Sequence, residues 1–134
     1  EDGILQEMSV ELPGKSGRLK FSVKDVHEFG AEGFGEIIKI VQNDYTKCFD
    51  YDKIKGNISV RVPQAADYLC IHPDGRRKLL KDYLVDVKIP REERNSLYLV
   101  AEDDLVLWVL RRRTSENRRV SDETRRVLLI EWIL

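Results

Sequence analysis

The sequence predicts an α+β domain made mostly of short antiparallel strands. Short runs in which apolar and polar residues alternate recur along the chain, and turn-forming proline and glycine separate them. Only one long amphipathic helical pattern, at about 76–88, interrupts these runs. Strands and helices do not follow the regular alternation that a parallel α/β sheet requires, so the α+β class is favoured.

The first half of the chain is expected to consist of strands joined by turns. Residues 4–12 alternate loosely, and a proline–glycine turn leads to a second strand at 18–23. Leu19, Phe21 and Val23 form one apolar face of that second strand. The elements expected next are a glycine-interrupted loop at 27–36, a strand at 37–41, a single helical turn within 47–57 and a strand at 58–62.

The main helix is predicted after a turn at 73–75, where Asp74 could cap its N-terminus. Its apolar residues fall on one stripe and most of its basic residues lie off that stripe, so one face would pack while the other stays in water. The stripe consists of Leu79, Leu80, Tyr83, Leu84 and Val87. Pro90 ends this helix and can open a short second helix that runs through Arg94.

Strands are predicted on both sides of this helix. Residues 67–72 form the strand before it. After it, 97–101 and 105–110 are two apolar runs joined by three acidic residues, which is typical of a hairpin. The apolar run at 127–134 is expected to close the fold as a buried strand.

Composition excludes several classes of protein. The chain has 134 residues, 35% of them charged and 42% hydrophobic, which is typical of a folded domain. No run approaches the roughly 18 apolar residues of a membrane span, and no secretion signal is found, so a cytoplasmic protein without membrane contact is expected. Cys48 and Cys70 have no partners at zinc-ligand spacing. The first residue is not methionine, and we interpret the chain as a piece of a longer protein.

No catalytic signature is found, so no catalytic residue, metal ligand or resident cofactor is predicted in this chain. The three glycines within 27–36 do not have the spacing of a dinucleotide-binding loop. His27 and His72 have no partner arranged for nucleophilic chemistry. Asp50 and Asp52 are interpreted as turn-capping residues rather than as an acid–base pair.

Basic residues are the strongest functional signal in the sequence. Residues 1–70 carry 9 basic and 12 acidic side chains, whereas residues 71–134 carry 14 and 12, so a local positive face can form although the net charge is −1. The candidate nucleic-acid contacts are Arg76, Arg77, Lys78, Lys81, Lys88, Arg91, Arg94, Arg111, Arg112 and Arg113. Acidic residues are interleaved among them, and such mixtures also form ordinary salt-bridged, solvated faces. The pattern alone leaves both interpretations open.

The segment KDYLVDVKIPREER at 81–94 resembles the C-terminal domain of bacterial tRNA(Ile)-lysidine synthetases. The matching positions are Lys81, Asp82, Asp86, Lys88, Ile89, Pro90, Arg91 and Arg94. Other segments keep the family's order and spacing: YTKCFDYDKIKG (45–56), DYL (67–69), LVLWVL (105–110), RTSE (113–116) and VSDETRRVL (120–128). The resemblance divides the chain into a strand-rich region at 1–62 and a family-like C-terminal domain at 63–134.

The resemblance implies that this chain is the non-catalytic, tRNA-holding part of an ATP-dependent ligase. Such ligases attach lysine to the wobble cytidine of tRNA(Ile), and the C-terminal domain would hold the tRNA near its acceptor stem. ATP and Mg²⁺ would be used by an N-terminal catalytic domain with an SGGxDS motif, which this sequence lacks. The implied partners are tRNA(Ile) and that catalytic domain, and a homodimer stays open. The resemblance also implies that the fold is similar to that of a domain in the phenylalanyl-tRNA synthetase β chain.

The chain departs from the family pattern in its charges, so individual contacts do not transfer. Pro63 and Gln64 stand where the family has two arginines, and Arg111 and Arg112 replace a glycine-containing pair. The alternative function is a docking module, in which Trp108 and Trp132 pack on a protein partner. A third class, an independent small enzyme, lacks any residue that could serve as its nucleophile or base.

Overall fold

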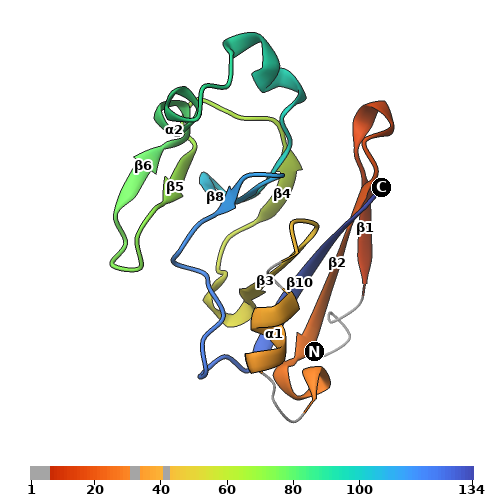
Figure 1. Cartoon of the computed structure of the whole chain (residues 1–134). Helices are drawn as coiled ribbons and strands as arrows, with labels where there is room; N and C mark the ends of the chain where they lie inside the picture. The colour runs from red at the N-terminus through yellow and green to blue at the C-terminus, as the bar shows by residue number, and fades with distance from the viewer. Residues whose placement is uncertain (1–6, 31–33, 41–42) are drawn as a thin grey trace. The chain divides into compact units, whose positions relative to one another are not determined.

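The computed structural model describes residues 7–30, 34–40 and 43–134 (Figure 1). The chain divides into two compact units: the first comprises Glu1–Ile54 and Arg119–Leu134, and the second comprises Lys55–Arg118. The first unit is discontinuous because its last strand pairs with strands from the beginning of the chain. The bounds of these packing units differ from the predicted division into 1–62 and 63–134. That division concerns the extent of the family region and stays a prediction.

The first unit is built on a four-stranded antiparallel sheet in the order β1-β2-β10-β3. Its strands are β1 (Met8–Glu11), β2 (Arg18–Asp25), β3 (Thr46–Asp50) and β10 (Arg126–Ile133). Its helices are η2 (Pro13–Lys15), η3 (Val26–Phe29), α1 (Phe34–Ile40) and η4 (Tyr51–Lys53). Gly17 fits the β1–β2 turn because its φ is +94° and a Cβ there would lie 2.4 Å from the carbonyl oxygen of Ile133.

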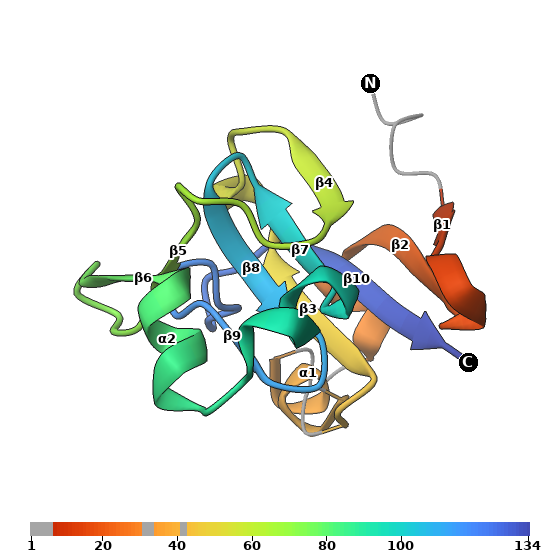
Figure 2. The same ribbon diagram turned by 90° about the horizontal axis from the view of Figure 1, so that it is seen from above.

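The second unit contains a six-stranded sheet in the order β4-β7-β8-β5-β6, with β9 also paired to β8 (Figure 2). Its strands are β4 (Ile58–Arg61), β5 (Tyr68–Cys70), β6 (Arg77–Leu79), β7 (Leu99–Glu102), β8 (Leu105–Val109) and β9 (Arg113–Thr114). Its helices are α2 (Leu80–Asp86) and the 3₁₀ helix η5 (Arg91–Ser96). Leu80 and Leu84 of α2 pack into the same core as Leu69, Leu99 and Val106 of the sheet.

The predicted α+β class is confirmed. Among the described residues, all strand pairs are antiparallel except β5 with β8. The strands predicted at 18–23, 58–62, 67–72 and 127–134 are present with small changes of bounds. The hairpin formed by β7 and β8 is also confirmed, and its turn places Asp103 at a φ of +52°.

The main helix is shorter than predicted. It spans Leu80–Asp86, so the prediction that it begins at residue 76 is wrong. Residues Arg77–Leu79 form strand β6, which pairs with β5 so that Tyr68 faces Leu79 and Cys70 faces Arg77. The turn before it contains Gly75 at a φ of +97°, which returns the chain onto β5. Asp74 therefore accepts a hydrogen bond from the Arg76 N–H in this turn (3.0 Å) instead of capping a helix. Leu79 is exposed rather than part of the buried stripe.

The end of α2 is a Schellman motif with a lysine at the left-handed position. The Ile89 N–H donates to the Leu84 carbonyl and the Lys88 N–H donates to the Val85 carbonyl. Lys88 has a φ of +62°, where glycine is usually found. Pro90 then precedes η5 at Arg91–Ser96, which confirms the short helix predicted after the proline.

We expect Lys88→Gly to raise the free energy of unfolding by about 1 kcal/mol, because it removes the steric cost of a side chain in the left-handed region. Urea unfolding of both proteins measures the difference. Lys88→Ala is the control, since it removes the same charge but keeps a Cβ at φ +62° and should not stabilise the chain.

Four other predicted elements differ from the structure. Residues 37–41 were expected as a strand, but Ile37 and Ile40 lie on α1, and residue 41 lies outside the described residues. The predicted loop at 27–36 contains the end of η3 and the start of α1, with 31–33 outside the described residues. The segment 47–57 mostly forms β3 and η4 rather than one helical turn, and within 4–12 only Met8–Glu11 is a described strand.

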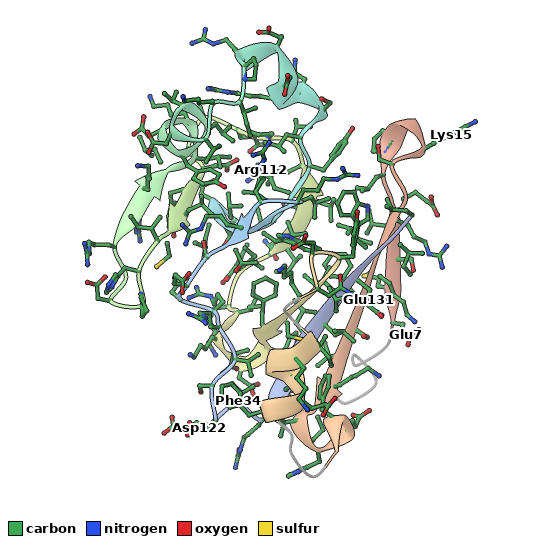
Figure 3. The ribbon with its side chains drawn as sticks, viewed as in Figure 1. Glu7, Lys15, Phe34, Arg112, Asp122 and Glu131 are labelled. Carbon is green, nitrogen blue, oxygen red and sulfur yellow. The ribbon has the colours of Figure 1, made fainter. Side chains whose placement is uncertain are left out.

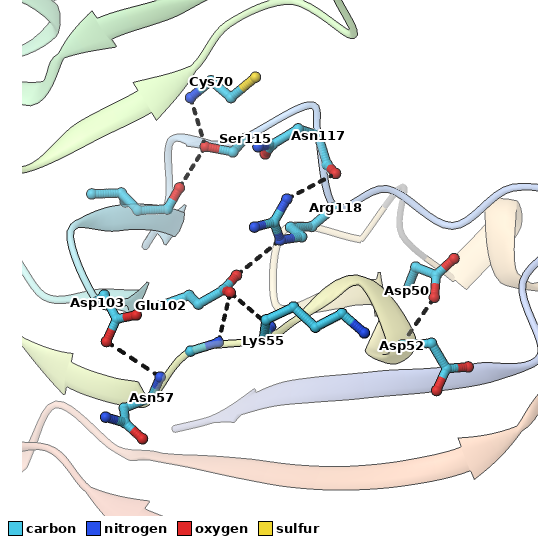
Figure 4. A network of polar contacts seen from close by, with 12 residues as sticks. Asp50, Asp52, Lys55, Asn57, Cys70, Glu102, Asp103, Ser115, Asn117 and Arg118 are labelled. Atoms are coloured by element: carbon cyan, nitrogen blue, oxygen red, sulfur yellow. Dashed lines mark hydrogen bonds and ion pairs between the residues drawn. The ribbon is translucent and has the colours of Figure 1, made fainter. Parts of the chain in front are cut away.

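Glu102 at the end of β7 organises the first residues of the second unit (Figure 4). Its carboxylate accepts hydrogen bonds from the backbone N–H groups of Lys55 (2.8 Å) and Gly56 (2.9 Å) and from Nε of Arg118 (2.8 Å). Burial alone would raise the pKa of Glu102, but together these hydrogen bonds and the Arg118 charge lower its pKa below the ordinary value. The ionised form is therefore the one that the fold stabilises.

This lowered pKa predicts a loss of stability in acid. A carboxyl whose pKa is depressed by folding contributes stability above its unfolded pKa, about 4.3, and loses it as the pH falls through the folded value. We expect Glu102→Gln to be less stable than the parent chain at pH 7 and the difference to shrink below about pH 4. Urea unfolding across pH 3–7 measures both curves. A difference that stayed constant with pH would contradict this role for the carboxylate.

Candidate nucleic-acid interface

Three of the candidate basic residues converge on one hollow in the second unit. Lys81 comes from α2, and Arg91 and Arg94 come from η5. The hollow has a volume of about 280 Å³. Its lining residues are Pro63, Gln64, Ala65, Leu80, Lys81, Leu84, Arg91, Arg94 and Asn95. No carboxylate is among these lining residues, so the hollow carries three positive charges and no negative one.

The 3₁₀ geometry of η5 separates its basic from its acidic side chains. A 3₁₀ helix repeats every three residues, so Arg91 and Arg94 lie on one face. Glu92 and Glu93 lie between them in the sequence and are exposed on the remaining faces. Neither acid forms an ion pair within the described residues, which means that the charges at 91 and 94 are not neutralised by their neighbours.

The wall of the hollow at 63–65 is held by a buried ion pair. Arg61 donates to both carboxylate oxygens of Asp67, at 2.8 and 2.7 Å, and the Gln64 N–H donates to the same carboxylate at 2.7 Å. The Asp67 side chain is fully buried. Its hydrogen bond raises the pKa of Arg61, so the guanidinium stays charged. The loop that carries Gln64 is thereby fixed in place.

The basic residues on and before β6 are engaged by neighbouring groups. Arg76 pairs with Asp74 (3.2 Å from Nε to Oδ2), and Lys78 pairs with Asp86 of α2. The Arg77 guanidinium lies 4.3 Å from the centre of the Tyr68 ring, a cation–π contact. These side chains are exposed or half-buried but have local partners.

Two of the three arginines after β8, Arg112 and Arg113, lie close enough to Tyr83 to affect its pKa. Arg112, which is labelled in Figure 3, is exposed, whereas Arg113 is half-buried and pairs with Glu116 at 3.2 Å. Burial raises the pKa of Tyr83, while the charges of Arg112 and Arg113 oppose that rise. Arg111 has a φ of +70°, a backbone conformation that favours glycine.

The structure therefore separates nine of the ten candidates into two groups, and the tenth, Arg111, also interacts with another group of the chain. Arg76, Lys78 and Arg113 each pair with an acid, and Arg77 stacks on a ring. The candidates that form no ion pair within the described residues are Lys81, Lys88, Arg91, Arg94 and Arg112. Interleaved acids neutralise part of the predicted face and leave the side chains around the hollow uncompensated.

A second hollow, in the first unit, was not predicted from the sequence. It has a volume of about 480 Å³ and is lined by Asp25, Val26, His27, Asp52, Arg125 and Arg126. Arg126 donates to Asp52 at 3.0 Å from Nε and lies over the Tyr51 ring. Acids and bases are mixed here, so this hollow has no strong preference for an anion.

Other kinds of site find no support among the described residues. Cys48 and Cys70 are free and buried, and burial raises the pKa of the Cys48 thiol to about 12, which keeps it protonated. No group of three potential metal ligands is found in the described part of the chain. None of the described helices has the length and apolar character needed to cross a membrane. Asp50 accepts from the Asp52 N–H (3.1 Å), as expected of a capping residue.

Comparison with known proteins identifies the family. A family profile described as the TilS substrate C-terminal domain matches residues 58–132. The chain belongs to this family. It is similar to the tRNA(Ile)-lysidine synthase of Caldanaerobacter subterraneus subsp. tengcongensis, with 40% identity over 130 residues that cover 92% of this chain and 26% of that protein. It is also similar to the tRNA(Ile)-lysidine synthase of Clostridium perfringens, with 35% identity over 94 residues that cover 70% of this chain and 20% of that protein.

The chain thus spans about a quarter or less of the length of these relatives. A solved structure titled "Crystal structure of TILS C-terminal domain" has the same fold, with a TM-score of 0.64 and 19% identity over 96% of this chain and 97% of that one. The resemblance of 81–94 to the TilS C-terminal domain is confirmed, and so is the fold that the resemblance implies. The roles of the individual basic residues stay predictions.

Proposed function

We propose that this chain is the tRNA-binding C-terminal portion of a tRNA(Ile)-lysidine synthase. The complete enzyme would attach lysine to the wobble cytidine of tRNA(Ile), and ATP with Mg²⁺ would be used by a separate catalytic domain. This portion would need no cofactor of its own. It would hold the tRNA, near the acceptor stem, while its partner domain acts on the anticodon. The proposal implies a cytoplasmic protein, because its substrate is a tRNA.

The observation that supports this function best is the group of uncompensated cations around the hollow. Lys81, Arg91 and Arg94 face no carboxylate there, and arginine's planar fork suits the oxygen atoms of a phosphate. RNA stems are recognised largely by shape and by contacts to phosphates and 2′-hydroxyls, which such a surface can provide. Family membership supplies the kind of RNA.

The test is a titration of the chain with a tRNA(Ile) transcript at several salt concentrations. Three to five phosphate contacts predict that log K falls with log salt with a slope of roughly −2 to −4.5. A transcript of an unrelated sequence measures the nonspecific part. If no binding is detected at low salt, the tRNA-holding role is wrong for this chain and the docking function is favoured.

The docking alternative is less well supported, because the two tryptophans that suggested it are buried. Trp108 is fully buried and Trp132 is 8% exposed. The Trp132 indole donates a hydrogen bond to the Ser16 carbonyl (2.9 Å), so its polar end is also satisfied within the chain. Neither side chain is available as an anchor for a protein partner. Contact with the catalytic domain would therefore have to use other residues.

A further inference from the structure

We propose that the hollow formed by α2, η5 and the 63–65 loop is a binding pocket for a single phosphate group, in which Arg94 is the central donor. This inference deepens the proposed function and rests on it for the source of the phosphate, which is an RNA strand. A defined pocket of this kind would hold one phosphate in a fixed position, whereas a general positive surface would not.

The strongest observation is an unused hydrogen-bond donor inside the site. Nε of Arg94 is buried and has no acceptor within the described residues. Buried polar atoms in folded proteins are almost always paired, so this unpaired N–H is a donor that an acceptor from outside the chain can satisfy. Arg94 lines the hollow, and its guanidinium can present Nε and a terminal nitrogen side by side to two oxygen atoms.

The side chains around Arg94 favour the binding of an anion. Lys81 and Arg91 add two positive charges to the same hollow, and Gln64 and Asn95 add amides. Leu80 and Leu84 are each 1% exposed and form an apolar floor, which lowers the local dielectric and strengthens the attraction for an anion. A volume of about 280 Å³ is sufficient for a phosphate group.

The pocket is also built in advance of binding. The Gln64 wall is held by the fully buried Asp67, and the arginines stand on one face of a short helix fixed by Pro90. A site whose groups are already placed loses little conformational freedom on binding.

The test uses the complete chain and reads the Arg94 Nε–H signal by ¹H–¹⁵N NMR. Three probes are added at equal ionic strength: inorganic phosphate, a short RNA stem with a 5′-monophosphate, and the same stem without it. The expected result is a shift of the Arg94 signal with phosphate and not with chloride. A shift with both stems assigns the pocket to an internal phosphodiester, and a shift only with the first stem assigns it to a terminal phosphate. No shift with any of the three probes overturns the pocket.

A charge-conserving variant separates this inference from the proposed function. Arg94→Lys keeps the charge but removes the planar fork and Nε, and we expect tRNA affinity to fall about tenfold, as for loss of one charge-assisted hydrogen bond. Arg18→Lys is the matched control: Arg18 is an exposed arginine on β2, it does not line the hollow and is not a candidate contact, and this variant should leave affinity unchanged. If Arg94→Lys binds tRNA as the parent chain does, the pocket is wrong while the tRNA-holding role stands. If the Arg94 signal shifts with inorganic phosphate but tRNA does not bind, the pocket stands and the tRNA-holding role is wrong.

Discussion

Replacing Asp67 with alanine should lower the free energy of unfolding by about 3–5 kcal/mol, because it leaves a buried cation without its partner. The Asp67 side chain has no exposed surface, and that of Arg61 is only 16% exposed. The change would remove both hydrogen bonds from Arg61 and the one from the Gln64 N–H. Urea unfolding followed by circular dichroism measures the loss.

Asp86→Ala is the control for this effect. Asp86 also pairs with a cation, Lys78, but its side chain is 57% exposed. Exposed ion pairs contribute between zero and about 1 kcal/mol, so this variant should unfold close to the parent chain. Equal losses from the two variants would contradict the view that burial makes the Asp67 pair important. Because Asp67 also holds the 63–65 wall, Asp67→Ala should weaken tRNA binding even below its unfolding temperature.

Reversing the charge of both Lys81 and Arg91 should weaken tRNA binding on the order of 100-fold at low salt. Both side chains are exposed, so the variant should stay folded. Loss of two phosphate contacts should also make the slope of log K against log salt less negative by about 1.4–1.8. Fluorescence anisotropy with labelled tRNA(Ile) at four salt concentrations measures both quantities.

The matched control reverses Arg76 and Arg77, two exposed arginines on and before β6. Arg76 is already engaged by Asp74, and Arg77 lies on the Tyr68 ring. We expect less than about a fivefold loss, since these charges are partly satisfied within the chain. A larger loss from Arg76 and Arg77 than from Lys81 and Arg91 would place the tRNA on the β5–β6 hairpin instead of on the hollow.

Much of the fold could be predicted because its strands are alternating or apolar runs bounded by turn-forming residues. The β7–β8 hairpin and β10 consist of apolar runs with clear turns between them, and the structure confirms them. The errors concern segments where one pattern fits two structures. Arg77–Leu79 continues the apolar periodicity of α2. It forms a strand instead, because the turn at Gly75 brings it alongside β5, with which it pairs. Residues 37–40 are rich in β-branched isoleucine, yet packing of Ile37 and Ile40 on one face favours a helix.

The candidate site was predicted as a list of residues and not as a shape. Lys81, Arg91 and Arg94 are candidate contacts by sequence, but Gln64 and Asn95 are not, because an isolated amide carries no signal for a binding site. The sequence also did not show which basic side chains would be neutralised by ion pairs with acidic residues. Lys78 pairs with Asp86, which becomes possible only because Lys78 lies on a strand instead of one helical turn before Asp82. The decisive feature, the buried Nε of Arg94, depends on packing that no local pattern contains.

The interrupted first unit has a consequence for synthesis of the protein. Strand β10 lies between β2 and β3, so their sheet lacks its middle strand until the last residues of this segment are made. The hairpins and helix of Lys55–Arg118 are complete in sequence before β10 emerges from the ribosome. The Lys55–Arg118 unit can therefore assemble first during translation, while β2 and β3 stay unpaired with each other until β10 is made.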